Sequence, residues 1–357
     1  MPKASCRWNL IINIFHYAMN PKRISTTFLS LLVWIVAVSQ TSGQWKPDIL
    51  GDGYEMRHVS QPDDYSGKVI STIIRKLAPD SLHSLKGVLY VHGFNDYFFQ
   101  SKMGDKFVEH GYDFYAVDLR KYGRSLLPGQ KKFELRNISE YFADIDSAVA
   151  VMKATGLREI ILMGHSTGGL TVSCYLNDRR PEIIKGLILN SPFLDWNLGR
   201  MEKFVCAVSA LGKVFPNMKI SQGKSTAYSE SLLKAHHGEW EYNTDWKLEQ
   251  SPDVTAGWVR AINLAQKSLR DGKADIRIPI LLMYSSNSVG GDGWEEKFNH
   301  GDAVLDVNDI RKYGAELGPD VTCVKVMEGL HDLVLSRPEV RVPLYRYIFS
   351  WLKREHL

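Results

Sequence analysis

Six short runs of consecutive apolar residues constrain the fold of this 357-residue chain more than any other feature. The runs occupy residues 87–93, 113–119, 159–165, 186–193, 279–285 and 322–329, and amphipathic stretches separate them. Strands that alternate with helices form parallel β-α-β units, and near-continuous apolar character is typical of strands covered by helices on both faces. The sequence therefore predicts an α/β fold in which helices flank a mostly parallel central sheet, with all six runs as buried central strands.

Two of the flanking helices can be placed from their patterns. Residues 137–152 carry apolar side chains along one helical face, and Asn137 and Glu140 suit the N-terminus of that helix. Residues 343–357 predict a terminal helix with basic residues in its last turns, where they are favoured by the helix dipole.

Residues 194–277 interrupt the alternation. They contain no convincing buried strand but hold four tryptophans, Trp196, Trp240, Trp246 and Trp258. We expect this segment to be a mainly helical cap insertion over the carboxyl edge of the sheet.

The first 43 residues have the layout of a secretory signal peptide. Basic residues 22–23 precede the apolar run 28–38, which is too short to span a bilayer comfortably, and small polar residues follow it. Met19 offers an alternative start that gives the leader an ordinary length. We expect a signal peptide over residues 1–43, one folded domain over residues 44–357, and a secreted or periplasmic protein. The alternative is an uncleaved signal anchor that tethers the protein to a membrane.

The excess of positive charge belongs to this leader. The formal net charge of +4 comes from four basic residues before Gly43, and without them the chain has 40 basic and 40 acidic residues. A balanced charge leaves no electrostatic footprint for nucleic acid, so we expect no nucleic-acid partner. The three cysteines after the leader, Cys174, Cys206 and Cys323, lack the spacing of a zinc or redox motif, and each is predicted to be a small buried apolar residue.

The pattern Gly164-His165-Ser166-Thr167-Gly168 carries the strongest chemical signal. It follows an apolar strand and precedes a helical stretch, which is the setting of a nucleophile elbow. At such an elbow the chain turns sharply, the serine takes a strained backbone, and glycines keep side chains out of the corner. Ser166 is therefore the candidate nucleophile.

A serine hydroxyl needs a base to become nucleophilic, and the base needs a carboxylate to orient it. At a strand-to-helix elbow of this kind, the acid and then the histidine follow the serine along the chain. His331 is the candidate base, because it directly follows the last strand and reaches the same sheet edge as Ser166. Asp302 is the candidate acid. Asp306 is the alternative, although it is well placed to cap a helix that begins near Val307.

Attack by Ser166 would create an oxyanion that needs preorganised hydrogen-bond donors. The backbone amide of Thr167 is one candidate, because it follows the nucleophile at the start of a helix. The amide of Phe94 is the other, because Phe94 lies in the loop that follows the first strand.

Together, these residues resemble the α/β-hydrolase superfamily, and within it the group of monoacylglycerol lipases, lysophospholipases and serine aminopeptidases. The resemblance covers about residues 65–355 and includes five stretches in the group's order: HGFNDY, YAVDLRKYGRS, GHSTGG, GLILNSPF and GDAVLD. It implies an α/β-hydrolase fold, with the nucleophile at Ser166, the acid at Asp302 and the base at His331. The same resemblance places the oxyanion amides at Phe94 and Thr167.

Two stretches depart from the group's pattern. Lys121-Tyr122 differs from its loop sequence, in a place that we expect not to touch catalysis. The connection between Ser285 and Asp302 is much longer than the group's, and we expect residues 286–300 to form a surface excursion.

The resemblance implies a serine hydrolase that cleaves carboxylic esters through an acyl-enzyme intermediate, acting on a small ester or lipid, and the leader adds the expectation that it is secreted. The aromatic side chains of the insertion suggest an apolar acyl or aromatic substrate, although they could equally pack the insertion onto the sheet. A lipid substrate adds contact with a membrane surface as an expectation.

One alternative is a serine peptidase or amidase, favoured if a carboxylate in the cap binds a substrate amine. The other is a non-catalytic binding protein of the same fold. The sequence contains no metal or nucleotide motif, so no metal or cofactor is expected.

Overall fold

The computed structural model describes residues 43–223, 225–291 and 293–357. The predicted signal peptide lies outside these residues, apart from Gly43. Residues Gln44–Leu357 form one compact unit. In this described part of the chain, no helix is both long enough and apolar enough to cross a membrane.

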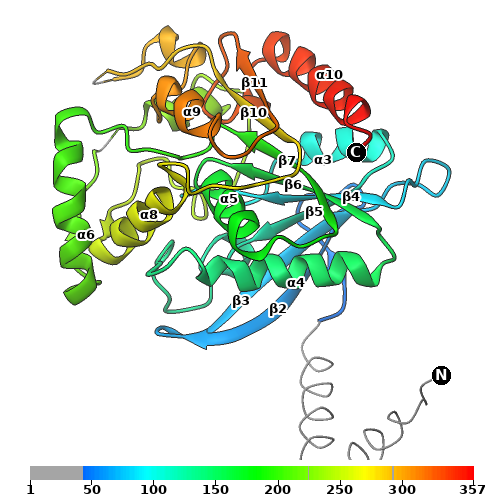
Figure 1. Cartoon of the computed structure of the whole chain (residues 1–357), viewed down its shortest axis with the longest axis horizontal. Coiled ribbons are helices and arrows are strands. Elements are labelled where there is room, and N and C mark those ends of the chain that lie inside the picture. Colours follow the sequence, from blue (N-terminus) through cyan, green and yellow to red (C-terminus); the bar gives the residue numbers. More distant parts are fainter. Residues whose placement is uncertain (1–42, 224, 292) are drawn as a thin grey trace, which may run out of the picture. The chain divides into compact units, whose positions relative to one another are not determined.

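Within the described residues, a nine-stranded sheet forms the centre of the unit (Figure 1). The strand order is β1-β2-β3-β5-β4-β6-β7-β10-β11, with parallel pairing from β5 to β11 and antiparallel pairing from β1 to β5. All six predicted strands are present, which confirms the mostly parallel sheet. The strands are β1 (Lys46–Pro47), β2 (Glu55–Asp64), β3 (Gly67–Lys76), β4 (Lys86–Val91), β5 (Asp113–Asp118), β6 (Glu159–His165), β7 (Ile184–Asn190), β10 (Ile280–Ser285) and β11 (Val321–Val326).

Helices cover both faces of this sheet. On one face, α4, α5, α8 and α9 share a core with alternate strand residues such as Leu89 and Leu162. On the other face, α3 and α10 pack over the intervening strand residues, such as Tyr90 and Met163. Successive side chains of a strand point to opposite faces, so strands covered twice must be apolar throughout. These helices are α3 (Ser101–Glu109), α4 (Glu140–Ala154), α5 (Thr167–Arg179), α8 (Ala256–Leu269), α9 (Val307–Gly314) and α10 (Pro338–Arg354).

Residues 194–277, which we call the cap, join β7 to β10 and are largely helical (Figure 1). Helices α6 and α8 pack so closely that a Cβ on Gly212 would lie 2.1 Å from the carbonyl oxygen of Ala256. The cap elements are the 3₁₀ helix η2 (Gly199–Phe204), α6 (Val205–Val214), α7 (Ala227–Leu232), α8, and the short antiparallel pair β8 (Lys219–Ile220) and β9 (Val254–Thr255).

The structure corrects the expectation that all six apolar runs are buried central strands. β11 is an edge strand that pairs with β10 alone, and most of its residues are partly or fully exposed. The antiparallel strands β1, β2 and β3 were not predicted. Polar residues occur throughout β2, and helices cover it less completely, so it lacks the continuous apolar signal of the central strands.

The terminal helix begins earlier than predicted. The predicted helix covers residues 343–357. The observed helix α10 instead begins with Pro338 and carries Pro343 inside it.

The cysteines also differ from expectation. Cys174 is buried as predicted, and burial raises the pKa of its thiol to about 12. Cys206 and Cys323 are exposed, which corrects their assignment as buried residues. Cys206 lies on α6 in the cap and Cys323 on the edge strand β11, and neither element is covered on all sides.

Buried ion pairs hold the segment that follows β5. The guanidinium of Arg124 contacts Asp48 at 2.6 Å and Asp118 at 2.9 Å, and all three side chains are at most 2% exposed. Nearby, Arg120 pairs with the buried Asp144 at 2.8 Å. These pairs tie the chain before β2, the end of β5 and helix α4 into one rigid frame.

We predict that Arg124→Met lowers the free energy of unfolding by about 3–5 kcal/mol, because it leaves two buried carboxylates without their partner. Arg277→Met is the matched control, since Arg277 pairs with Asp275 at the surface and its side chain is 75% exposed. Urea denaturation followed by circular dichroism measures both. Equal loss of stability in the two variants would contradict a structural role for the buried pairs.

Candidate active site

The turn between β6 and α5 holds Ser166 in a strained conformation. Its φ is 53° and its ψ is −120°, values that few residues with a side chain adopt. Hydrogen bonds to both backbone groups of Ser166 hold this conformation. The Ser166 amide donates to the Asn190 carbonyl at 3.1 Å, and the Phe193 amide donates to the Ser166 carbonyl at 2.9 Å. The serine therefore stands at the carboxyl edge of the sheet, directly before a helix N-terminus.

Glycines on each side of Ser166 are required by close backbone approach. A Cβ on Gly168 would lie 2.3 Å from the carbonyl oxygens of Val91 and His92, and a Cβ on Gly164 would lie 2.7 Å from the Gly168 carbonyl oxygen. The elbow is thus pressed against the loop that follows β4.

His331 and Asp302 meet through a buried hydrogen bond. The Nδ1 atom of His331 lies 2.9 Å from Oδ2 of Asp302, and the two side chains are 4% and 0% exposed. The other carboxylate oxygen, Oδ1, accepts from the amides of Val304 and Leu305 at 2.8 Å each. Because the carboxylate acts as acceptor, we assign the imidazole proton to Nδ1, which leaves Nε2 as a proton acceptor.

Asp306 does not share this position. Its carboxylate accepts from the Asn308 amide at 2.9 Å and caps α9, as predicted. Asp302 still lies beside His331 despite the long connection from β10, because the chain after β10 turns back and Asp302 pairs with residues near the end of that strand. The Asp302 amide donates to the Asn287 carbonyl, and the Val289 amide donates to the Asp302 carbonyl. The extra residues therefore form a surface loop that brings Asp302 back beside the residues directly after β10.

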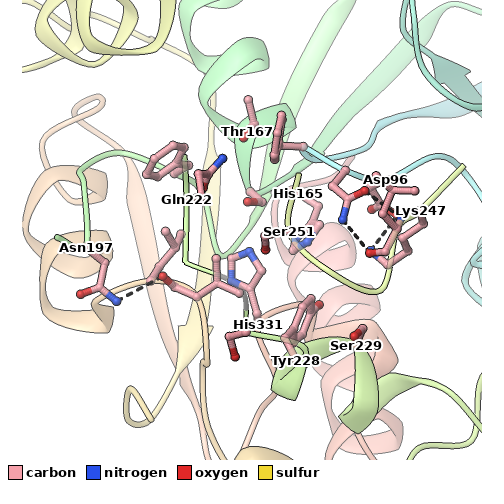
Figure 2. Close-up of a pocket in the computed structure, with 18 of the residues that line it drawn as sticks. Asp96, His165, Thr167, Asn197, Gln222, Tyr228, Ser229, Lys247, Ser251 and His331 are labelled. Atoms are coloured by element: carbon pink, nitrogen blue, oxygen red, sulfur yellow. Dashed lines mark hydrogen bonds and ion pairs between the residues drawn. The ribbon is translucent and has the colours of Figure 1, made fainter. Parts of the chain in front are cut away.

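Ser166, Thr167, His331 and Phe94 all line one cavity of about 280 Å³ (Figure 2). Within the described residues, no hydrogen bond joins the Ser166 hydroxyl to His331. Such bonds are often long in free enzymes and tighten when substrate arrives. The amides of Phe94 and Thr167 donate to no other group in the described chain, so both are available to a bound molecule. A Cβ on Gly93 would lie 3.0 Å from the Cβ of Ser166, which places the Phe94 loop directly beside the serine.

Comparison with known proteins agrees with this geometry. Residues 83–289 match the Hydrolase_4 family, described as serine aminopeptidase, S33. The chain belongs to this family. It is also 21% identical, over 257 residues, to phospholipase YtpA of Bacillus subtilis, covering 71% of this chain and 89% of that protein.

Solved structures show the same fold. The monoglyceride lipase of Saccharomyces cerevisiae has a TM-score of 0.61 at 16% identity, covering 84% of this chain and 95% of that one. The monoacylglycerol lipase of Paleococcus ferrophilus has a TM-score of 0.57 at 22% identity, covering 79% and 98%. The predicted α/β-hydrolase fold, and the resemblance to the monoacylglycerol lipase and lysophospholipase group, are confirmed.

One side of the cavity of this family member is apolar and largely aromatic. The Phe94 ring centre lies 4.7 Å from that of Trp258, which in turn lies 6.0 Å from that of Trp196. Two of the four cap tryptophans thus line the cavity. The other two serve packing: Trp240 donates its indole N–H to the Leu335 carbonyl, and Trp246 packs edge-on against Tyr97. The apolar lining residues are Phe94, Phe193, Trp196, Leu198, Trp258, Val304 and Leu305.

The rest of the lining is largely polar, and the cap supplies most of these polar residues. Lys247 makes a buried ion pair with Asp96, with Nζ 3.0 Å from Oδ1 (Figure 2). Tyr228 packs against the His331 ring with 5.6 Å between ring centres, and burial raises the pKa of its phenol far above the usual value. Burial likewise lowers the pKa of His165, so its imidazole is neutral. The polar lining residues include Asp96, Gln222, Tyr228, Ser229, Lys247, Glu249 and Ser251.

Among the described residues, Asp96, His165 and Asp332 form a group whose ligand atoms lie within 4.8 Å of one another, a spacing that suits a metal ion. Protein donors engage both oxygens of Asp332 and one oxygen of Asp96, while Oδ2 of Asp96 is buried without a hydrogen-bond partner among the residues that the structure describes. Lys247 pairs with Asp96, while Asn190 and Gln100 donate to Asp332 at 2.6 and 3.1 Å. We therefore derive the chemistry of the site from Ser166 and its neighbours.

Sequence reasoning missed several residues of this site. Lys247 and Asp96 were not singled out, because nothing in the local sequence shows that the cap contacts the loop after β4. Tyr122, in the loop expected not to touch catalysis, lies with its ring centre 4.8 Å from that of His92, at the base of the Phe94 loop.

We predict that Asp302→Asn slows phosphonylation of Ser166 by a fluorophosphonate about 10³- to 10⁴-fold, because the amide no longer holds the imidazole in the required tautomer. Asp306→Asn should leave the rate unchanged, since asparagine caps helices as well as aspartate does. Quenching the labelling reaction at set times and quantifying the labelled protein by mass spectrometry measures both rates. The reverse ranking would assign the acid to Asp306.

Proposed function

We propose that the protein is a serine hydrolase that cleaves carboxylic esters with Ser166, His331 and Asp302 as its triad. The observation that carries the proposal is the buried His331–Asp302 hydrogen bond, which lies beside the strained Ser166 in a single cavity. A strained serine before a helix, with an oriented imidazole nearby, is what nucleophilic attack on a carbonyl requires.

The proposed reaction has two steps. The Ser166 Oγ attacks the ester carbonyl carbon while His331 Nε2 takes the hydroxyl proton, and the amides of Phe94 and Thr167 bind the oxyanion. The intermediate collapses, the C–O bond to the alcohol breaks, and the alcohol leaves with the proton held by His331. Water then attacks the acyl-enzyme with His331 again as base, which releases the acid and restores the serine.

The cavity supports a substrate with an apolar acyl group. The aromatic side, with Trp196 and Trp258, can hold an acyl chain or ring, while the polar side beyond Lys247 can meet a hydrophilic alcohol portion. The relatives described as a phospholipase and as monoacylglycerol lipases favour lipid esters as the substrate class.

An amidase or aminopeptidase is the second candidate, because the family description names serine aminopeptidases. Such an enzyme would use a free carboxylate to hold a substrate amine. Of the carboxylates lining the cavity in the described chain, Asp96 pairs with Lys247, and Glu249 lies 3.1 Å from the imidazole of His236. These pairings favour the ester hydrolase. The presence of all three triad residues favours an enzyme over a non-catalytic binding protein of this fold.

We also propose that the protein is exported and meets its substrate at a lipid surface. Export is inferred from the sequence of residues 1–43, which lie outside the described residues apart from Gly43. Contact with lipid is supported by the apolar side chains that η2, α6 and their flanks expose, of which Leu198 also lines the cavity. These are Leu198, Met201, Phe204, Leu211, Val214 and Phe215, each between 46% and 68% exposed.

We predict that Ser166→Ala abolishes hydrolysis of p-nitrophenyl butyrate, with a loss of at least about 10³-fold, while the fold is kept. Ser173→Ala is the matched control, because Ser173 lies on the same helix and its hydroxyl only donates to the Gly169 carbonyl. A panel that adds monoacylglycerols, lysophospholipids and aminoacyl p-nitroanilides ranks the two candidate functions. Retained ester hydrolysis by Ser166→Ala, or faster turnover of the anilides than of any ester, would overturn the proposal.

We further predict that Phe204→Ser combined with Phe215→Ser weakens binding to phosphatidylcholine–phosphatidylglycerol vesicles about tenfold or more, because both rings lose apolar area buried in the interface. Hydrolysis of the soluble ester should be unaffected. Met327→Ser is the control, since Met327 is 68% exposed at the end of β11, away from the cap. Co-sedimentation with vesicles measures the binding. Equal binding by the double variant and the wild-type protein would remove the lipid-contact proposal.

A further inference from the structure

Three consecutive residues of the loop after β4 each hold a different residue of the cap. We call residues 92–97 the oxyanion loop and residues 243–249 the clamp segment. Asn95, Asp96 and Tyr97 of the loop make their side-chain contacts with Leu248, Lys247 and Asn243 of the segment. Phe94 directly precedes these residues, so the contacts between the loop and the cap lie next to the proposed oxyanion amide of Phe94.

Asn95 forms the central contact. Its side-chain Nδ2 donates to the Leu248 carbonyl at 2.8 Å, and its Oδ1 accepts from the Leu248 amide, also at 2.8 Å. One side chain therefore satisfies both backbone groups of one cap residue, as a neighbouring strand would. Asn95 has a φ of 50°, a left-handed conformation that asparagine tolerates better than most residues.

Two further contacts flank this one. Asp96 and Lys247 form the buried ion pair described above, and the Lys247 ammonium lies 5.7 to 5.9 Å from the ring centres of Phe99, Tyr228 and Tyr242. The Tyr97 hydroxyl accepts from the Asn243 amide at 2.8 Å, and its ring packs edge-on against Trp246. The clamp segment thus holds residues 95–97, the second half of the loop.

The other face of the oxyanion loop is pressed against the elbow. Gly93 lies against Ser166, and the carbonyl of His92 lies against Gly168, at distances that leave no room for a Cβ. The His92 ring is itself fixed, since its Nε2 accepts from the Leu119 amide at 3.1 Å. The Phe94 amide therefore lies between the elbow and the residues that the clamp segment holds.

We propose that Asn95 is a positioning residue that lets the cap set the direction of the Phe94 amide, so that the oxyanion site is complete only when the clamp segment is docked. This inference rests on the proposed function. Asn95 lines the cavity, but Leu248 engages both polar atoms of its side chain, so we assign it a role that acts through Phe94. It therefore affects the transition state, in which the oxyanion forms, more than it affects ground-state binding.

The test compares Asn95→Gly and Asn95→Ala in the full protein. Glycine keeps the left-handed backbone and removes only the two hydrogen bonds to Leu248, whereas alanine also strains the backbone. Loss of one oxyanion donor costs about 10²- to 10³-fold in kcat, so misdirecting one should cost about 10- to 100-fold. We expect Asn95→Gly to lower kcat for p-nitrophenyl butyrate by that factor, with KM within about threefold.

Two additional readouts separate positioning from loss of structure. Phosphonylation of Ser166 by a fluorophosphonate should slow in parallel with kcat, because the phosphonyl oxygen uses the same amides. The Kd of a non-hydrolysable ether analogue should stay unchanged, because it forms no oxyanion. Asn177→Ala is the matched control: the Asn177 side chain on α5 also bonds two backbone groups of the cap, accepting from the Asp275 amide at 2.8 Å and donating to the Lys273 carbonyl at 3.5 Å. Asn177 is not among the residues that line the cavity, so loss of these bonds should leave kcat unchanged.

Three results would overturn the inference: an unchanged kcat in Asn95→Gly, a rise in KM alone, or an equal loss of kcat in Asn177→Ala. If the Asn95 variants fail to fold, Tyr97→Phe replaces them, because it removes only the hydrogen bond to Asn243. We expect this variant to lower kcat by about two- to fivefold without raising KM. A kcat equal to that of the wild-type protein would count against the proposal. Wild-type protein without esterase activity would instead contradict the proposed function.

Discussion

The close approach of the elbow to the loop after β4 is the constraint on which the site depends. Gly168 admits no Cβ because the carbonyls of Val91 and His92 occupy that space, and Ser166 keeps a left-handed φ only because β7 and α5 hold both of its sides. This contact brings a strained hydroxyl, a helix N-terminus and the Phe94 amide together. Near this site, buried ion pairs of Arg124 and Arg120 fix the segment that follows β5.

The sequence was sufficient for the parts of the fold whose signal is local. The central strands could be predicted because helices cover both of their faces, and the elbow because glycines must flank a strained serine. The edge strand β11 and the strands β1 to β3 were misjudged or missed, since burial on one face alone leaves a weaker pattern. Asp302 could be preferred to Asp306 because Asp306 already had a capping role at the start of α9.

The parts that could not be predicted depend on contacts across long stretches of chain. Lys247 lies 151 positions from Asp96, and Leu248 lies 153 positions from Asn95, so no local pattern could pair them. The cap tryptophans illustrate the same limit: Trp196 and Trp258 line the cavity while Trp240 and Trp246 fill packing positions, although all four looked alike in the sequence. The cap thus contributes the cavity lining and the contacts that hold the oxyanion loop, and the sheet contributes the elbow.

The most direct measurement is a crystal structure of the protein after reaction with a fluorophosphonate. The account predicts phosphorus bonded to Oγ of Ser166, with the phosphonyl oxygen accepting hydrogen bonds from the amides of Phe94 and Thr167 and the His331 ring facing the adduct. An adduct on another residue, or a phosphonyl oxygen turned away from both amides, would contradict it.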